Sequence, residues 1–357
     1  MKLLFIYYVP SGGMETLNRE RCKALQVRGV HCHQLYLQSG TGLQNIQKIP
    51  TYVTNADAGI RTLLTRENYD AIIVSSHHAM LPRLRELGYA KLLIYEAQGL
   101  GGYNVAREYL LRARPAISAH ANGLLYPNTR HLISLFREIY PAKKHFCFDN
   151  CLDTERFTYR PGKTQPAPIM AWVGRIEPNK NWRMFLNIAS CLTTTVKNLD
   201  IWLFEDDTIS LEKADFNARV KQLRLDARLV RHANIPHERM AHYYSRIGDS
   251  GGFLCSTSVM EGFGYAVLEA MSCRCPVAAS DSDGVRCFIT HNETGKLFAQ
   301  DDLMGAVREA RELLIRAELR KRIRDNAEIR AMSQFSPRLY AHRFMNMLAE
   351  LGLNTSL

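Results

Sequence analysis

The chain has 357 residues, of which 46% are hydrophobic, and its formal net charge is +11. At roughly 150 residues per domain this length predicts two domains, and the apolar content excludes a disordered chain. No apolar run reaches the ~18 residues of a membrane span. The apolar start lacks the cleavage site of a signal peptide. We therefore expect a soluble, cytoplasmic protein.

The positive charge is concentrated in the first half of the chain. Residues 1–160 carry 20 Lys and Arg against 12 Asp and Glu, whereas the remainder carries 26 against 23. The first half could meet an anionic acceptor or, as a peripheral protein, the inner face of a membrane, and the alternative is an ordinary solvated basic surface. No nucleic-acid-binding motif is present, so nucleic acid is not an expected partner. The nine cysteines form no CxxC pair and are expected to be reduced, mostly buried thiols.

Apolar runs typical of strands alternate with helical patterns along the chain. In the first half we expect a helix at 15–28 and strands at 3–8, 31–37, 71–75 and 91–95. Three prolines within 160–168 predict a linker. The pattern then restarts, with strands expected at 169–173, 201–204, 228–231, 252–255 and 277–279. The predicted fold class is therefore α/β, with two Rossmann-like parallel-sheet domains that face each other across a cleft.

The segment 261–271, EGFGYAVLEAM, carries the strongest signal for a binding site. Gly262 and Gly264 stand where a loop is expected to enter a helix, so the backbone can approach a ligand closely and the first N–H groups of the helix suit a phosphate. Glu261 would reach the cleft, and Glu269 could accept hydrogen bonds from sugar hydroxyls. The alternative is that both glutamates are solvated on a helix face.

Two further motifs point to an anionic ligand. In 172–181, WVGRIEPNKN, a strand is expected to end at Gly174, and Arg175 and Lys180 follow it, so that two cations converge on a position suited to a diphosphate. Between the first strand and the first helix, Gly12 and Gly13 permit a similarly close approach, or form a simple tight turn.

Taken along the chain, the motif with Gly12, Gly13 and Glu15, then the motif at 172–181, and then the motif at 261–271 resemble the retaining glycosyltransferases of family 4, which have the GT-B fold. The segment 150–157 resembles the inter-domain segment of that family, 275–277 the Pro-Val that follows its glutamate helix, and 335–336 the start of its C-terminal helix. The resemblance covers essentially the whole chain and is weakest between 38 and 70. It implies an acceptor-side domain at 1–160, a donor domain at 161–333, and a helix at 334–357 that crosses back to the first domain.

The resemblance implies a role for each matching position. Arg175 and Lys180 would hold the donor diphosphate, Glu269 would bind the ribose hydroxyls, and Glu261 would face the donor sugar near the reacting centre. Further donor contacts are expected at Gly13, Gly174, Ala233, Asn234, Phe263, Gly264 and Tyr265. A histidine opposite the donor would be His78, with His77 as the alternative. The loop 95–103 would line the acceptor pocket.

One departure from the family concerns acidic residues. Where many members have Gly-x-Gly, this chain has Glu205, Asp206 and Asp207, which add negative charge near a dianion site and offer the one alternative position for a metal. If no metal binds there, Arg175, Lys180 and the helix N-terminus beyond Gly264 supply the positive charge that compensates the diphosphate. We therefore expect metal-independent turnover. The segment 237–242, HERMAH, resembles a zinc-protease motif, but its two histidines point ~140° apart on a helix and predict no metal site.

The expected function is retaining transfer of a sugar from a nucleoside diphosphate sugar, with UDP as the expected carrier, to an acceptor hydroxyl. The donor is a co-substrate, and no separate cofactor is expected. The acceptor class stays open among a small molecule, a glycan and a lipid-linked sugar. Two alternatives are a sugar-nucleotide 2-epimerase, which would need further acid/base carboxylates, and a non-catalytic nucleotide-sugar-binding subunit.

Overall fold

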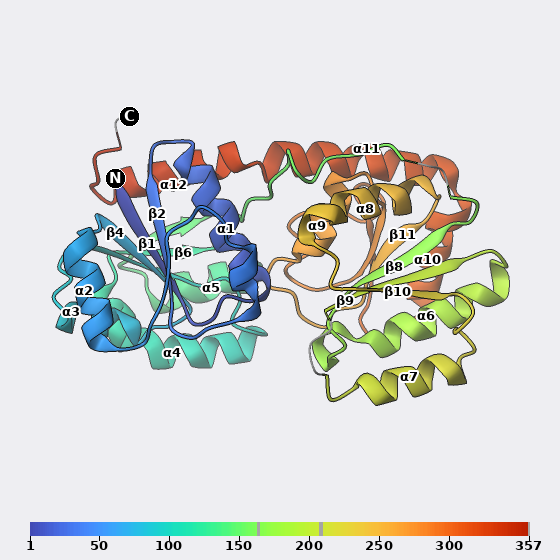
Figure 1. Cartoon of the computed structure of the whole chain (residues 1–357), viewed down its shortest axis with the longest axis horizontal. Coiled ribbons are helices and arrows are strands. Elements are labelled where there is room, and N and C mark those ends of the chain that lie inside the picture. The colour runs from blue at the N-terminus through green and yellow to red at the C-terminus, as the bar shows by residue number, and fades with distance from the viewer. Residues whose placement is uncertain (163–164, 207–209, 356–357) are drawn as a thin grey trace. The chain divides into compact units, whose positions relative to one another are not determined.

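A computed structural model of the chain describes residues 1–162, 165–206 and 210–355 (Figure 1). The chain forms two compact units, of which the first comprises Met1–Cys151 with Phe335–Leu357 and the second Leu152–Gln334. The first break lies within the segment 150–157, ahead of the proline-rich stretch at 160–168, of which Lys163 and Thr164 lie outside the described residues. Among the described helices, none is long and apolar enough to cross a membrane.

The first unit is built on a seven-stranded parallel sheet in the order β3-β2-β1-β4-β5-β6-β7. Its strands are β1 (Lys2–Tyr7), β2 (His31–Tyr36), β3 (Thr51–Val53), β4 (Ala71–Ser75), β5 (Leu92–Glu96), β6 (Gly123–Tyr126) and β7 (Lys144–Cys147). Its helices are α1 (Gly12–Gln26), α2 (Asp57–Glu67), α3 (Met80–Glu86), α4 (Tyr103–His120), α5 (Arg130–Ile139) and α12 (Pro337–Glu350), with a 3-10 turn at Thr41–Asn45.

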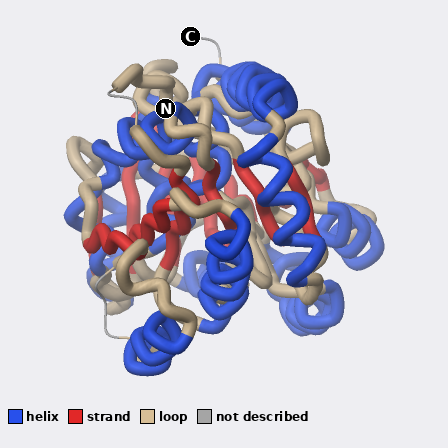
Figure 2. Tube along the Cα trace, turned by 90° about the vertical axis from the view of Figure 1, so that its right-hand side faces the viewer, coloured by secondary structure: helices blue, strands red, loops and turns tan. Residues whose placement is uncertain are grey.

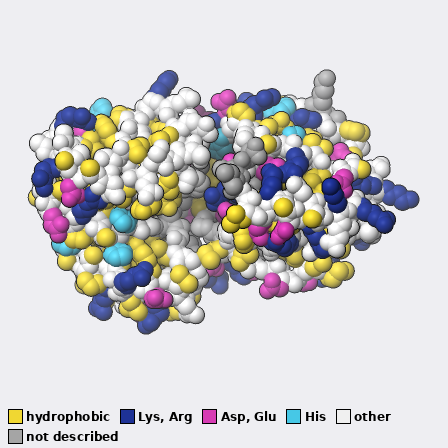
Figure 3. Space-filling model, turned by 60° about the horizontal axis from the view of Figure 1, so that its bottom comes forward, with side chains coloured by type: hydrophobic (Ala, Val, Ile, Leu, Met, Phe, Trp, Pro, Cys, Tyr) yellow, Lys and Arg dark blue, Asp and Glu magenta, His cyan; other side chains and the backbone are white. Residues whose placement is uncertain are grey.

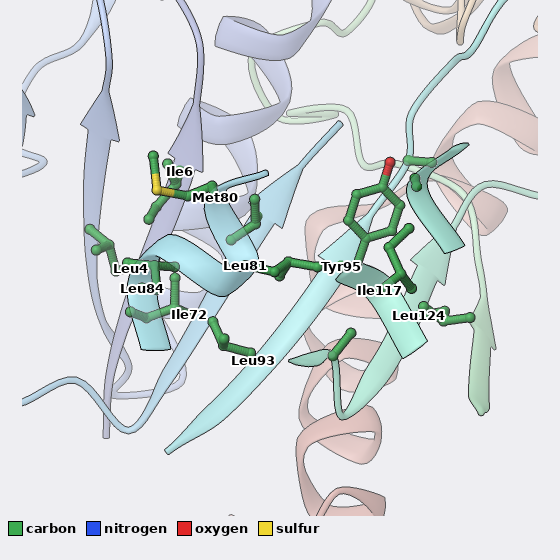
Figure 4. Close-up of a cluster of buried hydrophobic side chains, with 14 of the residues drawn as sticks. Leu4, Ile6, Ile72, Met80, Leu81, Leu84, Leu93, Tyr95, Ile117 and Leu124 are labelled. Atoms are coloured by element: carbon green, nitrogen blue, oxygen red, sulfur yellow. The ribbon is translucent and has the colours of Figure 1, made fainter. Parts of the chain in front are cut away.

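Both faces of this sheet are buried, which explains the continuous apolar runs of its strands. Leu4 and Ile6 of β1 point to the face that α2, α3, α4 and α5 cover, and Figure 4 shows them with the side chains of α3 and the neighbouring strands. Leu3 and Phe5 point to the opposite face, which α1 and α12 cover. The C-terminal helix α12 thus completes the core of the first unit, although it follows the whole second unit in sequence.

The second unit repeats the architecture with a six-stranded parallel sheet in the order β10-β9-β8-β11-β12-β13. Its strands are β8 (Ile169–Gly174), β9 (Asp200–Glu205), β10 (Leu229–Ala233), β11 (Phe253–Ser256), β12 (Val277–Ser280) and β13 (Lys296–Phe298). Its α-helices are α6 (Trp182–Thr195), α7 (Lys213–Gln222), α8 (Met240–Asp249), α9 (Tyr265–Ser272), α10 (Leu303–Ile315) and α11 (Ala317–Gln334). Two 3-10 turns, η2 (Pro178–Lys180) and η3 (His237–Arg239), lie in its loops.

Helices again cover both faces of the sheet, as Figure 2 shows by colour for the strands and helices. One face packs its apolar side chains, among them Met170 and Trp172, against α6, α7, α10 and α11. The other face carries α8 and α9. The predicted α/β class with two parallel-sheet domains is therefore confirmed.

In both sheets the strand order reverses beside the first strand of the unit. The reversal lies between β1 and β4 in the first sheet and between β8 and β11 in the second. Loops at the carboxyl ends of two such strands diverge to opposite faces, and open parallel sheets bind ligands in the resulting crevice. The motifs at 172–181 and 261–271 follow β8 and β11, so both stand at the reversal point of the second sheet.

Candidate functional site

The loop after β8 brings a cation to the reversal point of the second sheet. The strand ends at Gly174, and the chain passes through η2 into α6. Asn181 has left-handed backbone angles (φ 46°, ψ 49°), and its side chain accepts a hydrogen bond from the Met184 N–H as the N-cap of α6. This turn stops η2 at Lys180 and leaves the lysine at the carboxyl edge of the sheet.

The loop after β8 is hydrogen-bonded to the loop after β11 through Asn179 and Lys180. Asn179 accepts from the Val259 N–H through its carbonyl (2.8 Å) and from the Met260 N–H through its side chain (3.2 Å). Its amide donates to the Met260 carbonyl at 3.1 Å. The Thr257 hydroxyl donates to the Lys180 carbonyl at 2.9 Å. Because the two loops are held together by these bonds, the side chains at 180 and 261 are placed side by side.

Lys180 and Glu261 form an ion pair, with 2.5 Å between Lys180 Nζ and Glu261 Oε1. The lysine side chain is 22% exposed and the glutamate side chain 16%, so the pair is largely shielded from water. Arg175 differs, because its side chain is 55% exposed and, among the residues that the structure describes, forms an ion pair with Glu177 at 3.2 Å. The two predicted cations therefore lie on the same loop, one already paired and one open to solvent.

The start of α9 follows directly. Gly264 is the N-cap and adopts φ 79°, a conformation that favours glycine, and a Cβ there would lie 3.1 Å from Val285 Cγ1. As a glycine, this N-cap has no side chain with which to cap the helix. Phe263 is buried and packs on the rings of Tyr265 and Phe288, with centroids 5.0 and 5.6 Å away.

Glu269 lies in the second turn of α9 and is buried, with a side chain only 5% exposed. One carboxylate oxygen is 2.9 Å from His237 Nε2, and the other accepts from the Tyr244 hydroxyl at 3.2 Å. Burial and the neighbouring Glu269 raise the pKa of Tyr244 well above its usual value. Neither Glu261 nor Glu269 is a solvated helix-face glutamate, so that alternative is wrong.

The segment 237–242 does not form a metal site in the structure. His237 lies in η3 against Glu269, whereas His242 lies on α8 and is exposed. No group of three or more His, Cys, Asp or Glu side chains among the described residues could hold a metal ion.

Glu205 does not contribute the negative charge that the sequence predicted for the acidic residues 205–207. Glu205, the last residue of β9, is 3% exposed at its side chain and pairs with Lys213 at 2.7 Å and with Arg231 at 2.6 Å. Its charge is thus compensated by two cations, and it adds no net negative charge to the site. Asp206 is exposed, and Asp207 lies outside the described residues.

Ala233 and Asn234 stand at the end of β10 and are exposed. Asn234 adopts a left-handed conformation with φ 51°, and its N–H donates to the Glu205 carbonyl at 3.0 Å. The loop therefore turns sharply at the carboxyl edge of the second sheet, next to the end of β9, and leads into η3.

In the first unit, the predicted residues lie in the loops after β1 and β4, which flank the reversal point of that sheet. Gly13 is the second residue of α1 and is exposed. His78 Nδ1 lies 3.1 Å from the Tyr109 hydroxyl, which itself donates to the Ser76 carbonyl. Burial and then the charge of Arg112 lower the pKa of His78. The pKa of His77 is lowered as well, first by burial.

The predicted acceptor loop at 95–103 is only partly at the surface. Tyr95 and Glu96 are fully buried, which contradicts their expected place in a pocket lining. Glu96 forms an ion pair with the fully buried Arg21 at 2.6 Å and accepts from the Ser75 hydroxyl at 2.5 Å. A buried charge requires such partners, so Glu96 serves the core of the first unit. Tyr103 is exposed at the start of α4.

Sequence reasoning did not assign roles to Asn179, Thr257, His237 and Tyr244. Asn179 and His237 stand inside segments that we singled out, but their partners are distant in sequence, and no local pattern announces such contacts. These contacts become visible only in the structure, where segments that are distant in sequence lie together.

Comparison with known proteins agrees with this arrangement. Residues 153–330 match the family model described as Glycosyl transferases group 1. Over 101 residues the chain is 33% identical to Glycosyltransferase 1 domain-containing protein 1 of Xenopus tropicalis, a match that covers 28% of this chain and 29% of the relative. Over 164 residues it is 26% identical to N-acetylgalactosamine-N,N'-diacetylbacillosaminyl-diphospho-undecaprenol 4-alpha-N-acetylgalactosaminyltransferase of Campylobacter jejuni, covering 44% of this chain and 40% of the relative. The chain thus spans less than half the length of these curated relatives.

Two solved structures are similar over nearly the whole chain. HepE of Anabaena in complex with UDP and glucose superposes with a TM-score of 0.81 at 16% identity, covering 98% of this chain and 99% of that chain. Sucrose-phosphate synthase of Thermosynechococcus elongatus superposes with a TM-score of 0.79 at 15% identity, with the same coverage. At these identities the likeness shows the fold.

The chain has the two-domain GT-B architecture of these similar structures. Residues 153–330, which match the glycosyl transferases group 1 model, lie in the second unit, which also holds the site described above.

Proposed function

We propose that the protein transfers a sugar from a nucleoside diphosphate sugar, with UDP as the carrier and with retention at the sugar carbon, to an acceptor hydroxyl. The observation that carries the proposal is the ion pair of Lys180 with Glu261 at the reversal point of the second sheet, with Arg175 on the same loop as Lys180 and the start of α9 directly after Glu261 in sequence. Two cations and a helix N-terminus suit a diphosphate, and the carboxylate suits a sugar.

Two comparisons support the donor class. Structures of the similar HepE of Anabaena contain UDP, and one contains UDP-glucose. The name of the Campylobacter jejuni relative describes transfer of N-acetylgalactosamine to a diphospho-undecaprenol-linked acceptor. We extend both to this chain as a proposal about its donor and, more loosely, about a lipid-linked acceptor.

The proposed chemistry depends on the stabilisation of the leaving group. As the bond between the sugar carbon and the diphosphate breaks, negative charge grows on the phosphate, where Arg175, Lys180 and the first N–H groups of α9 stabilise it. The acceptor oxygen forms the new bond to the same carbon, and its proton passes to the departing phosphate oxygen. Glu261 orients the donor sugar, and Glu269 binds the ribose.

The remaining donor contacts are expected from the resemblance. In the second unit they are Gly174, Ala233, Asn234, Phe263, Gly264 and Tyr265. In the first unit, Gly13 and His78 are expected to contact the donor. We also propose that turnover needs neither a cofactor nor a divalent metal, because Arg175 and Lys180 already compensate the negative charge of the diphosphate.

The location of the acceptor bears on the basic charge of the chain. On the face shown in Figure 3, Lys and Arg side chains are spread over both units. If the acceptor is lipid-linked, the cationic residues within 1–160 would approach an anionic membrane surface. We expect the protein to co-sediment with anionic vesicles. We expect this co-sedimentation to be lost with zwitterionic vesicles and at high salt.

The test of the proposed function is incubation with UDP-sugars, followed by measurement of UDP release with and without an acceptor pool from a cell lysate. Acceptor-dependent release of UDP supports transfer. An epimerase would change the sugar nucleotide without an acceptor, and a binding subunit would release no UDP. No observation on the site favours either of these two alternatives.

A further inference from the structure

The contact between His237 and Glu269 joins η3 to α9, across 32 positions of the sequence. Glu269 is the carboxylate for which we propose ribose binding, and it sits in the second turn of α9. His237 begins η3, directly after the loop that contains Ala233 and Asn234. The 2.9 Å contact between His237 Nε2 and Glu269 Oε1 therefore ties this loop to the α9 carboxylate.

Both oxygens of Glu269 are held, but each keeps further capacity as an acceptor. An ionised carboxylate offers about four lone-pair sites. His237 uses one site on Oε1 and Tyr244 uses one on Oε2, so each oxygen retains a site. Two neighbouring acceptors fixed in one plane match the two adjacent hydroxyls of a ribose. A carboxylate free to rotate would lose rotamer entropy each time it bound that diol.

The two holding groups are not equivalent. Tyr244 is fully buried on α8 and belongs to the interior of the unit. The His237 side chain is 27% exposed, and its ring packs on Phe157 with a centroid distance of 4.9 Å. His237 therefore fixes Glu269 from the side that solvent reaches, which is the side from which a ligand must arrive.

We propose that His237 is a positioning residue for donor binding: it orients the Glu269 carboxylate toward the ribose hydroxyls and couples that contact to the loop at 233–236. The proposal rests on the proposed function, because it needs a nucleotide donor at this site. His237 does not contact the reacting atoms in this scheme. It affects the affinity for the ribose, and it does so by positioning Glu269.

The test compares two ligands in three variants. Binding of UDP and of 2′,3′-dideoxy-UDP is measured by calorimetry for the wild-type chain, His237→Phe and His237→Gln, with CDP, ADP and GDP in parallel to find the preferred base. Phe keeps an aromatic ring against Phe157 but removes the hydrogen bond, whereas Gln keeps an N–H donor. His242→Phe is the matched control, since His242 belongs to the same segment but is exposed and does not contact Glu269.

We expect His237→Phe to weaken UDP binding about tenfold, which corresponds to the loss of about one charge-assisted hydrogen bond between Glu269 and the ribose, and to leave the affinity for the dideoxy ligand unchanged. His237→Gln and His242→Phe should bind both ligands as the wild type does. Equal weakening of both ligands by His237→Phe, or no weakening of either, would overturn the positioning role. A wild-type chain that binds the ribose and dideoxy forms equally would overturn it too. Failure of the wild type to bind any nucleoside diphosphate would instead refute the proposed function itself.

Discussion

The ammonium of Lys180 lies 2.5 Å from the carboxylate of Glu261, although the two residues are 81 positions apart in the chain. Both were expected to contact the donor, the lysine at the diphosphate and the glutamate at the sugar. Their pairing means that the site holds its own counter-charge before any ligand binds. A diphosphate that enters must share Lys180 with Glu261, whereas Arg175 is open to it.

Arg175→Ala and Lys180→Ala should each lower kcat/KM for the donor about tenfold to over a hundredfold. A charge-assisted contact to phosphate contributes roughly 1.5–3 kcal/mol, which corresponds to that range. Steady-state kinetics with the preferred UDP-sugar measures the effect. Arg308→Ala, an exposed cation on α10, is the control and should be inert. Near-wild-type kinetics of both site variants would show that the diphosphate binds elsewhere.

The same two variants should differ in stability. Lys180→Ala leaves the largely shielded Glu261 carboxylate without its partner and should lower the free energy of unfolding by about 1 kcal/mol. Arg175→Ala removes an exposed side chain with one surface contact and should leave Tm unchanged. Thermal unfolding without ligand separates the two. A fall in Tm for Arg175→Ala alone would contradict the assignment of the paired and the open cation.

Glu269→Gln should raise the donor KM, and Glu261→Gln should mainly lower kcat. Ribose contacts are about equal in the ground and transition states, so loss of one is a uniform loss of binding. A carboxylate at the reacting sugar matters more in the transition state. Full Michaelis curves for both variants give the split, and the reverse pattern would show that the two roles are exchanged.

Gly284→Ala should disturb the loop of Glu261. A Cβ at residue 284 would lie 2.3 Å from the Glu261 carbonyl oxygen, far closer than any van der Waals contact, so the backbone must move. We expect a loss of activity that exceeds any loss of fold, which circular dichroism and donor kinetics measure together. Gly162→Ala is the control, because a Cβ there would lie 3.5 Å from His242 Cε1 and 3.6 Å from Arg246 Cγ, which are ordinary van der Waals contacts. Unchanged kinetics for Gly284→Ala would mean that the position of this loop does not matter for catalysis.

The protein should lose stability as the pH falls below about 6.5, and His232 should contribute to this loss. Burial and then the charge of Arg246 lower the pKa of His232, whose ring stacks on Phe204 with a centroid distance of 4.8 Å. The unfolded chain therefore binds a proton at a higher pH than the folded chain does, and the free energy of unfolding falls with pH in that window. His232→Phe should flatten the dependence of Tm on pH between 7.5 and 5.5. A wild-type pH profile in the His232→Phe variant would contradict this origin.

Much of the fold was determined by the sequence by itself, because its signals are local. The strand at 71–75 is apolar on both faces, and parallel strands that are buried on both sides have such continuous apolar runs in their sequence. The motifs at 172–181 and 261–271 predicted the end of β8 and the start of α9, because Gly174 is the last residue of β8 and Gly264, with φ 79°, is the N-cap of α9. The strands β3, β6, β7 and β13 were not predicted. Short length alone does not explain this, because the four-residue strands β11 and β12 were predicted, but β3 and β7 lack the buried apolar run of those two strands.

Tertiary structure decided what the charged residues do. Glu205 was expected to add negative charge to the site, but Lys213 and Arg231 compensate it from α7 and β10. Glu96 was expected in a pocket, but it is buried with Arg21 because α1 covers that face of the first sheet. Glu269 and His237 meet only because α9 and η3 pack together in the second unit. A carboxylate looks the same in sequence whether it is solvated, paired or open to a ligand, and the difference arises from side chains that the chain brings near it from elsewhere.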